Sequence, residues 1–286
     1  MMNVIEFRQF SKRNGAFTLQ NLNFPIQSGY ITGLIGPNGS GKTTMIRSIM
    51  NLIRPDFGEV LVFDQSYHNQ ERDIKRRIGF VYDEDFFYNH LTVNEMKKIV
   101  SSFYPTWNES VFRKYLDDFQ LPSRRKIRDL SKGMKTKFAL ATALAHEPDL
   151  LIMDEPTSGL DPVFRREVLS ILSEYIQEGT RSVLFSTHIS TDLERIADYI
   201  VYIRNGQLKY CGSKEDLIDS YVLVKGPIEW LRLNRLENTF SGKQQNALGF
   251  EGLIAKESYS EDVFGNQVTV EMPSLDDILF YTREEK

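Results

Sequence analysis

The feature that most constrains this chain is the segment GPNGSGKT at residues 36–43, which lies between a short apolar run and an amphipathic stretch. It fits the pattern G-x-x-x-x-G-K-[ST], in which glycines let backbone N–H groups curl around phosphate oxygens. The first turn of the helix that follows adds the positive end of its dipole. A strand, this loop and a helix in succession therefore predict an α/β domain that binds a nucleotide.

Two side chains of this loop have particular expected roles. Lys42 is expected to reach the β- and γ-phosphates, and the Thr43 hydroxyl to bind Mg²⁺. The alternative is a chance glycine turn, which the strand before the loop and the helix after it argue against. The residues expected to contact the nucleotide are Gly36, Pro37, Asn38, Gly39, Ser40, Gly41, Lys42, Thr43 and Thr44.

A second apolar run, LLIMDEP at residues 150–156, ends in two acids. Side chains alternate along a strand, so Asp154 and Glu155 are expected to point to opposite sides. Asp154 would lie near the Mg²⁺ held by Thr43. Glu155 would face the γ-phosphate, placed to polarise a water molecule. The structural alternative is a solvated strand end.

Two further segments carry candidate polar groups. LFSTH ends an apolar strand at His188, which is expected at the sheet edge where ligands bind in open α/β sheets. There it could hydrogen-bond the γ-phosphate or the attacking water, although a lone histidine is more often an ordinary polar residue. In LSKGMK, residues 130–135, Ser131 is a natural N-cap, and small Gly133 with the helix dipole favours an anion.

The periodicity of the remaining chain predicts its organisation. Alternating residues 3–10 and 17–26 indicate antiparallel strands, and helical patterns fill about residues 84–145 as an insertion. We expect an ATPase domain over residues 1–218 and a small α+β extension over residues 219–286. In the extension we expect strands at 221–226 and 266–272, a loop at 235–249, and a helix at 274–284 capped by Ser274.

Composition excludes several classes of protein. The formal net charge is −4, which gives no basic footprint and predicts no nucleic-acid partner. Cys211 is the single cysteine, so neither a disulfide framework nor a multi-cysteine metal site is possible. No apolar run approaches the ~20 residues of a membrane span, and no signal-peptide pattern opens the chain. We expect a cytoplasmic protein that serves a membrane, if at all, through a partner.

In this order, the segments resemble the ATP-binding subunit of ATP-binding cassette (ABC) transporters over about residues 3–218. GPNGSGKTT looks like the Walker A motif, LSKGM like the LSGGQ signature, LLIMDEP like Walker B, SGLD like the D-loop, and His188 like the switch histidine. The pattern is most similar to bacterial exporter ATPases of the antibiotic-resistance and YtrB-like type. The implied fold is α/β, a P-loop NTPase core with a mixed sheet, an antiparallel β subdomain and a helical insertion.

The resemblance also implies a mechanism. Two such domains, as a homodimer or a heterodimer, sandwich two ATP molecules head to tail with Mg²⁺. Their closure and opening drive separate membrane subunits at the cytoplasmic face of the membrane. One subunit would supply Lys42, Thr43, Asp154, Glu155 and His188, and the other Ser131 and Gly133.

The chain departs from the family's pattern in the signature and at the adenine. Lys132 replaces the first signature glycine, and Met134 replaces the glutamine. Asn14 stands where the family has an aromatic residue that stacks on adenine. Phe10 or Phe17 could substitute, or both could be strand core. Because stacking on aromatics is worth ~1–3 kcal/mol per base, nucleotide affinity would be weaker without a substitute.

A third departure lies in VYDEDFFYNHLTV, residues 81–93, where Asp83 occupies the place of the family's Q-loop glutamine. A carboxylate is a hard oxygen ligand, so Asp83 could serve the Mg²⁺, or it could be a solvated turn. The resemblance puts Phe86, Phe87 and Tyr88 where the insertion receives a coupling helix of the membrane subunit. Packing within the insertion is the alternative.

The expected function is ATP binding and hydrolysis that drives transport, with export of amphipathic peptides, drugs or lipids favoured. An importer ATPase is one alternative. Another is a soluble ABC ATPase for DNA repair or translation, against which the absence of a coiled coil and of a second cassette argues. The extension at 219–286 could regulate, dimerise or only cover the domain.

Overall fold

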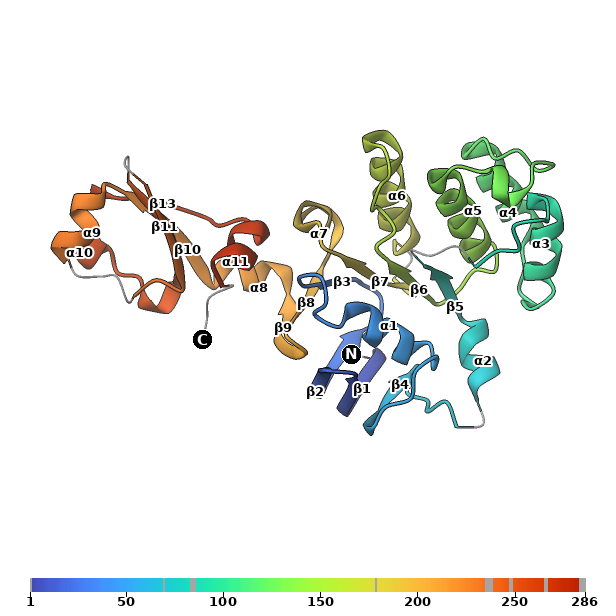
Figure 1. Cartoon of the computed structure of the whole chain (residues 1–286), viewed down its shortest axis with the longest axis horizontal. Helices are drawn as coiled ribbons and strands as arrows, with labels where there is room; N and C mark the ends of the chain where they lie inside the picture. The colour runs from blue at the N-terminus through green and yellow to red at the C-terminus, as the bar shows by residue number, and fades with distance from the viewer. Residues whose placement is uncertain are drawn as a thin grey trace. The chain divides into compact units, whose positions relative to one another are not determined.

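The computed structural model describes residues 2–68, 70–82, 86–177, 179–234, 239–246, 249–264 and 267–282. Its backbone forms two compact units (Figure 1). The first comprises Met1–His188 and Tyr199–Cys211, and the second Ile189–Asp198 and Gly212–Lys286. The expected division after residue 218 did not foresee that Ile189–Asp198 would pack with the C-terminal part of the chain.

A six-stranded sheet in the order β5-β6-β7-β3-β8-β9 forms the centre of the first unit. Every residue of the neighbouring strands β3, β6 and β7 is buried, which explains their apolar sequences. The strands comprise β3 (Ile31–Ile35), β5 (Ile78–Val81), β6 (Leu150–Asp154), β7 (Ser182–Thr187), β8 (Tyr199–Arg204) and β9 (Gln207–Ser213). β3, β6 and β7 pair in parallel, with Ile35 beside Thr187 and Asp154 beside Ser186, so their carboxyl ends meet at one edge.

A second sheet has the order β2-β1-β4 and is antiparallel, as the alternating sequence predicted. Its strands are β1 (Asn3–Asn14), β2 (Phe17–Gln27) and β4 (Phe57–Val62). Helix α1 (Lys42–Ile49) begins directly after the phosphate loop and contributes Met45 and Ile46 to the core shared by both sheets. The loop is therefore fixed by a buried strand on one side and a buried helix face on the other.

The helical insertion contains α3 (Val93–Ser101), α4 (Glu109–Asp118), a 3-10 turn η1 (Ile127–Asp129) and α5 (Lys132–Leu144). These helices gather in one cluster, drawn in green in Figure 1, and α5 also packs on β5. α2 (Glu71–Arg76) precedes β5, and α6 (Pro162–Tyr175) follows β6. The side chains of Thr92, Asn108, Ser131 and Asp161 cap α3, α4, α5 and α6, so the predicted Ser131 cap is confirmed.

The second unit has an antiparallel sheet in the order β11-β12-β10-β13. Its elements are α7 (Ser190–Ile196), α8 (Lys214–Asp219), β10 (Tyr221–Gly226), α9 (Ile228–Asn234), β11 (Gly242–Gln245), β12 (Phe250–Ala255), η3 (Lys256–Ser258), α10 (Glu261–Phe264), β13 (Thr269–Glu271) and α11 (Leu275–Tyr281). Trp230 stacks on Phe250 and on Phe264, which joins α9, β12 and α10 in a core separate from that of the first unit. Ser274 caps α11, as predicted.

One expectation for the extension was wrong. Residues 235–249 were expected to form a loop, yet Gly242–Gln245 forms the edge strand β11 and pairs with β12. The sequence GKQQ has no β-branched or aromatic residue, so backbone hydrogen bonds decide this strand. A Cβ at Gly242 would lie 2.0 Å from the carbonyl oxygen of Tyr281, so only glycine allows α11 to approach. Among the described residues, no helix is long and apolar enough to cross a membrane.

Candidate nucleotide-binding site

The phosphate loop closes around the Lys42 ammonium group. Lys42 Nζ donates to the carbonyl oxygens of Gly36 at 2.7 Å and of Pro37 at 3.4 Å. The side chain is buried, and burial lowers its pKa although Glu155 and Asp154 act in the opposite direction. Gly41 has φ 107°, and a Cβ there would lie 2.5 Å from Leu19 Cδ2, so this glycine is required. The positive charge is thus held inside the loop before any phosphate arrives.

Glu155 lies at the centre of the candidate site. Its carboxylate oxygen Oε1 is 3.7 Å from Lys42 Nζ, and Oε2 is 2.7 Å from His188 Nδ1. The backbone N–H of His188 also donates to Oε2, at 3.3 Å. Glu155 adopts φ 49°, a left-handed conformation that non-glycine residues rarely take and that functional sites often retain. The structure therefore brings together the three predicted residues Lys42, Glu155 and His188.

Asp154 is the last residue of β6, and Glu155 follows it outside the strand. Asp154 is buried, and the hydroxyl of Ser186 donates to its Oδ1 at 2.5 Å. Ser186 was missed by the sequence reasoning. Its only signal in the sequence was its place two residues before His188, and the structure sets it directly opposite Asp154 in the β6–β7 pairing. Ser186 orients this carboxylate as an outer partner orients a metal ligand.

The residues around the loop form a hollow of about 370 Å³. Its lining includes Asn14 and Phe17, which face the loop from the ends of β1 and β2. Phe10 is fully buried in the core and is therefore not available to an adenine ring. Of Phe10 and Phe17, only Phe17 lines the hollow around the phosphate loop. The full lining is Asn14, Phe17, Asn38, Gly39, Ser40, Gly41, Lys42, Thr43, Thr44 and Glu155.

The site has oxygen ligands suited to Mg²⁺. Thr43 presents an exposed hydroxyl in the first turn of α1, and Asp154 supplies a carboxylate fixed by Ser186. The Ser40 hydroxyl is buried and has no hydrogen-bond partner among the described residues, as expected of a loop shaped for a polar ligand. Hydroxyl and carboxylate oxygens fit a hard cation. Asp83, the third expected ligand, lies outside the described residues.

The signature residues lie apart from this hollow. Ser131 is exposed, and its hydroxyl accepts a hydrogen bond from Met134 N at 3.3 Å as the cap of α5. Gly133 is half-buried, and a Cβ there would lie 3.9 Å from Leu160 Cδ2, an ordinary van der Waals distance. Neither residue lines the hollow around the phosphate loop. The chain's own fold thus leaves Ser131 without a role in its nucleotide pocket.

The three aromatic residues after the acidic triplet separate into two kinds. Phe87 packs on the buried Phe138 of α5, with ring centroids 4.7 Å apart, so it belongs to the core of the insertion. Phe86 and Tyr88 are 69% and 57% exposed. The packing alternative therefore holds for Phe87, whereas Phe86 and Tyr88 remain available to a partner.

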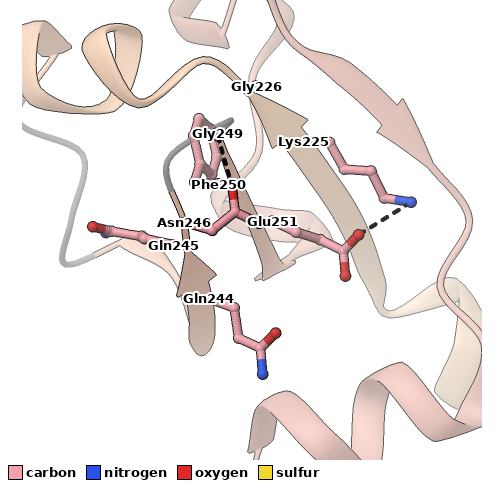
Figure 2. Close-up of a pocket in the computed structure, with 8 residues that line it drawn as sticks. All are labelled: Lys225, Gly226, Gln244, Gln245, Asn246, Gly249, Phe250 and Glu251. Carbon is pink, nitrogen blue, oxygen red and sulfur yellow. Dashed lines mark hydrogen bonds and ion pairs between the residues drawn. The ribbon is translucent and has the colours of Figure 1, made fainter.

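A second hollow lies in the C-terminal unit, where Figure 2 shows Lys225, Phe250 and Glu251 around it. Lys225 Nζ is 3.2 Å from Glu251 and 2.8 Å from Glu271, so the lysine charge is already balanced by two carboxylates. The other side chains in this hollow are mostly amides. It gives no reason to place a second nucleotide there.

Comparisons with known proteins agree with the geometry. Residues 19–158 match the family model described as ABC transporter. The chain is 31% identical over 223 residues to the ABC transporter ATP-binding protein YtrB of Bacillus subtilis, covering 78% of this chain and 76% of that protein. It is also 31% identical to the bacitracin transport ATP-binding protein BcrA of Bacillus licheniformis, covering 73% and 69%.

Solved structures give the same result. An ATP-binding subunit of an ABC transporter is 28% identical, with a TM-score of 0.70, and the match covers 76% of this chain and 92% of that one. A dimeric ATP-binding cassette in a post-hydrolysis state, bound to ADP and Pi, is 25% identical with a TM-score of 0.63, covering 73% and 98%. The fold and the site thus define a P-loop ATPase of the cassette class. The chain belongs to the family of ABC transporter ATP-binding proteins and is an ATP-hydrolysing subunit of that family.

Proposed function

We propose that Lys42, Glu155 and His188 carry out ATP hydrolysis in this chain. The observation that carries the proposal is the contact of one carboxylate, Glu155, with both Lys42 Nζ and His188 Nδ1. Glu155 accepts the proton of the attacking water, and Lys42 stabilises negative charge on the β- and γ-phosphates. His188 orients Glu155 and donates toward the γ-phosphate side. Thr43 and Asp154 would hold Mg²⁺, which neutralises phosphate charge when bound.

The signature residues are proposed to act on a second copy or a paired cassette. Ser131 and Gly133 lie in the first turn of a 13-residue helix whose N-terminus is exposed. Such a terminus favours an anion, and the γ-phosphate bound by a partner chain supplies one. A head-to-tail dimer would thereby complete both sites. This arrangement is supported by the dimeric cassette to which the chain is similar.

The membrane partner is proposed to dock on the helical insertion. Phe86 and Tyr88 are exposed aromatic side chains next to the strand β5, and exposed aromatics are typical anchors of protein interfaces. Export of amphipathic peptides, drugs or lipids is the transport reaction we favour, because relatives are named for bacitracin transport and Nod factor export. An importer ATPase is the second candidate, and a cassette ATPase uncoupled from a membrane is the third.

The catalytic assignment is tested with Glu155→Gln. Glutamine keeps the shape but cannot accept a proton, so turnover should fall by about 10²–10⁴-fold while ATP binding persists. Size-exclusion chromatography with Mg²⁺ and ATP should then reveal an accumulated dimer. The exposed Glu174→Gln on α6 is the matched control and should behave as wild type. A Glu155→Gln protein with normal turnover would overturn the assignment.

The transport assignment is tested by purification from native membranes. The chain should copurify with polytopic membrane subunits, and Phe86→Ala/Tyr88→Ala should weaken that association while ATP binding to the isolated chain is unchanged. Phe87→Ala is not a suitable control, because it removes a core side chain. Copurification with ribosomes or DNA in place of membrane subunits would favour the uncoupled ATPase.

A further inference from the structure

The helix that carries the signature segment, α5, contacts the segment that follows the candidate catalytic carboxylate. Other faces of α5 pack on α3, α4 and β5, and α6 lies beside it (Figure 1). The chain passes from Glu155 toward α6 through two turns. In the first, the backbone N–H of Ser158 donates to Glu155 O at 3.1 Å, and in the second that of Leu160 donates to Thr157 O at 3.2 Å. Few residues therefore separate Glu155 from the side chains that face α5.

Lys137 reaches from α5 to α6. Its Nζ lies 4.3 Å from the ring centroid of Phe164, in the first turn of α6, and 5.9 Å from that of Phe119, directly after α4. The two rings meet edge to face with centroids 5.7 Å apart, and both are buried. A cation within about 6 Å of an aromatic face is attracted to it, and more strongly where water is excluded. Lys137 therefore joins three helices at one point.

The cap of α6 lies within electrostatic reach of the same lysine. The Asp161 side chain accepts from the backbone N–H groups of Val163 and Phe164, each at 3.0 Å. The N–H of Phe164 is the largest cause that lowers the pKa of the Asp161 carboxyl, and the N–H of Val163 and the charge of Lys137 act in the same direction. The ammonium group of Lys137 thus interacts with both the capping carboxylate and the first aromatic ring of α6.

The same face of α5 carries Gly133 one turn earlier. Residues four apart lie on one face of a helix, and a Cβ at Gly133 would lie 3.9 Å from Leu160 Cδ2. Gly133 and Lys137 therefore both face residues 160–164. At 1.5 Å per residue, they are only ~6 Å apart along the axis of α5. A contact at Lys137 is thus close enough to set where the first backbone N–H groups of α5 point.

We propose that Lys137 is a positioning residue that fixes the start of α5, and with it Ser131 and Gly133, against the segment that follows Glu155. The two signature residues are then held where the γ-phosphate bound by a second chain can meet them. The inference rests on their proposed role in a head-to-tail dimer. Lys137 does not line the hollow around the phosphate loop of its own chain. Its loss should therefore lower the rate of hydrolysis and leave ADP binding unchanged.

The test uses the full chain with Lys137→Met, which removes the charge and keeps an apolar side chain of similar length. The ATPase rate should fall by about 3- to 30-fold, the range that one cation–π contact supports, with the Kd of fluorescently labelled ADP within about 2-fold of wild type. Lys137→Arg keeps a cation over the rings and should retain a rate close to wild type. Lys114→Met is the matched control, because it removes a cation 5.6 Å from the Tyr115 ring within α4 and leaves α5 and α6 untouched.

Mixing purified variants shows which part of the composite site Lys137 serves. Lys42→Ala inactivates the phosphate loop, and Gly133→Asp inactivates the signature segment. A mixture of Lys137→Met with Lys42→Ala should exceed the mean of the two separate ATPase rates and approach about 25% of the wild-type rate, because half of the random dimers regain one intact site. A mixture of Lys137→Met with Gly133→Asp should stay at the mean, because every site then contains an impaired signature segment.

The outcomes separate the inference from the arrangement on which it rests. If Lys42→Ala and Gly133→Asp do not restore activity when mixed, the head-to-tail dimer of this chain is wrong and the inference falls with it. If they do restore activity but Lys137→Met alone keeps the wild-type rate, the inference fails alone. It also fails if Lys137→Met recovers with Gly133→Asp, since Lys137 would then serve the phosphate loop of its own chain. Recovery with neither variant, or an equal loss in Lys114→Met, would show a general loss of folding and would likewise overturn it.

Discussion

The phosphate loop and the signature segment are two helix starts that we propose to bind phosphate, and they are built differently. At the phosphate loop, Lys42 and Asp154 are buried, and Glu155 already contacts two of its expected partners. At the signature, Ser131 is exposed and its hydroxyl only caps its own helix. The phosphate loop is organised by contacts within the chain. The signature segment is left exposed, so the surface of another chain can reach it.

The glycines of the two segments illustrate the difference. A Cβ at Gly41 would collide with Leu19 in the same chain, so the internal fold demands that glycine. A Cβ at Gly133 would meet Leu160 only at 3.9 Å, so the internal fold permits a larger residue there. A requirement for glycine at position 133 must therefore come from outside the chain.

The largest expected effect comes from inactivating the phosphate loop in one variant and the signature segment in another, and then mixing the two purified variants. Lys42→Ala removes the buried cation of the phosphate loop. Gly133→Asp places a carboxylate in the first turn of α5, where it suits the helix dipole but repels a γ-phosphate. Each variant alone should lose at least ~100-fold in ATPase rate. An equal mixture should regain up to ~25% of wild-type rate, because half of the random dimers contain one intact composite site.

The control for this experiment is Gly133→Ala, which adds only a methyl group and should stay folded. Recovery of ATPase activity on mixing Lys42→Ala with Gly133→Asp would establish that the phosphate loop and the signature segment of one active site come from different copies of the chain. High activity of Gly133→Asp on its own would break the comparison, since the signature would then have no part in the site. Failure to recover despite dimerisation would contradict a head-to-tail arrangement of this chain with itself.

The next effect concerns the helix that carries the signature. His146 follows α5, is buried, and stacks on Tyr104 with ring centroids 3.8 Å apart. Burial lowers the pKa of His146 from 6.5 to about 4. The neutral form is the one the fold accepts, so this stabilisation is present above pH 6.5 and is lost as the pH falls from 6.5 toward 4. At 1.36 kcal/mol per pKa unit it amounts to about 3 kcal/mol.

Hydrogen exchange between pH 7.5 and 4.5, corrected for intrinsic rates, measures this loss locally. Protection of α5 should fall more than that of β6 and β7, whose buried residues contain no histidine. His146→Phe keeps the stacking and cannot titrate, so it should remove most of the difference. If the protection of α5 depends on pH equally in wild type and in His146→Phe, the prediction is wrong.

A smaller effect is expected at Ser186. Ser186→Ala removes the hydrogen bond to Asp154 and leaves that buried carboxylate less well oriented. Outer partners of metal ligands typically contribute 10- to 100-fold in metal affinity, so Mg²⁺ should bind the nucleotide complex more weakly by about that factor. Calorimetric titration of ATP at varied Mg²⁺ measures it. Ser182→Ala, at the opposite end of β7, is the matched control and should leave the Mg²⁺ dependence unchanged.

The smallest effect is expected where the base of the nucleotide would lie. Phe17→Ala should weaken ATP and ADP binding by ~1–3 kcal/mol if the ring stacks on adenine, and Phe17→Tyr should not. Asn14→Tyr returns an aromatic residue to the pocket lining and should strengthen binding. Fluorescence titration with a labelled nucleotide distinguishes these cases. Unchanged affinity in both Phe17→Ala and Asn14→Tyr would leave adenine recognition to backbone contacts.

Much of the central domain could be predicted because its signals are local. The apolar runs that became β3, β6 and β7 and the capping residue Ser131 act within a few residues of chain. Glu155 and His188 could be proposed for the same edge because parallel strands end together. Ser186 was missed because a serine in a buried strand gains its role only from the neighbour opposite. Phe10 and Phe17 could not be separated by sequence, since both are aromatic residues on adjoining strands.

The C-terminal part was harder to predict for a physical reason. β11 has no side-chain signal and exists because its backbone pairs with β12. The membership of α7 in the second unit rests on Ser190 and Glu194 reaching residues more than 80 positions away in the chain. Local patterns carry no information about contacts at that separation, which depend on how complete surfaces fit.

By itself, the sequence determined that this chain binds nucleotide phosphates and which strands surround the site, because glycine conformations, helix starts and strand alternation are properties of short segments. Only the tertiary structure decided that one carboxylate, Glu155, meets both Lys42 and His188, and that Phe17 rather than Phe10 faces the pocket. It also decided that the helix after His188 is held by the end of the chain. These facts depend on side chains brought together by packing, and packing is a property of the whole fold.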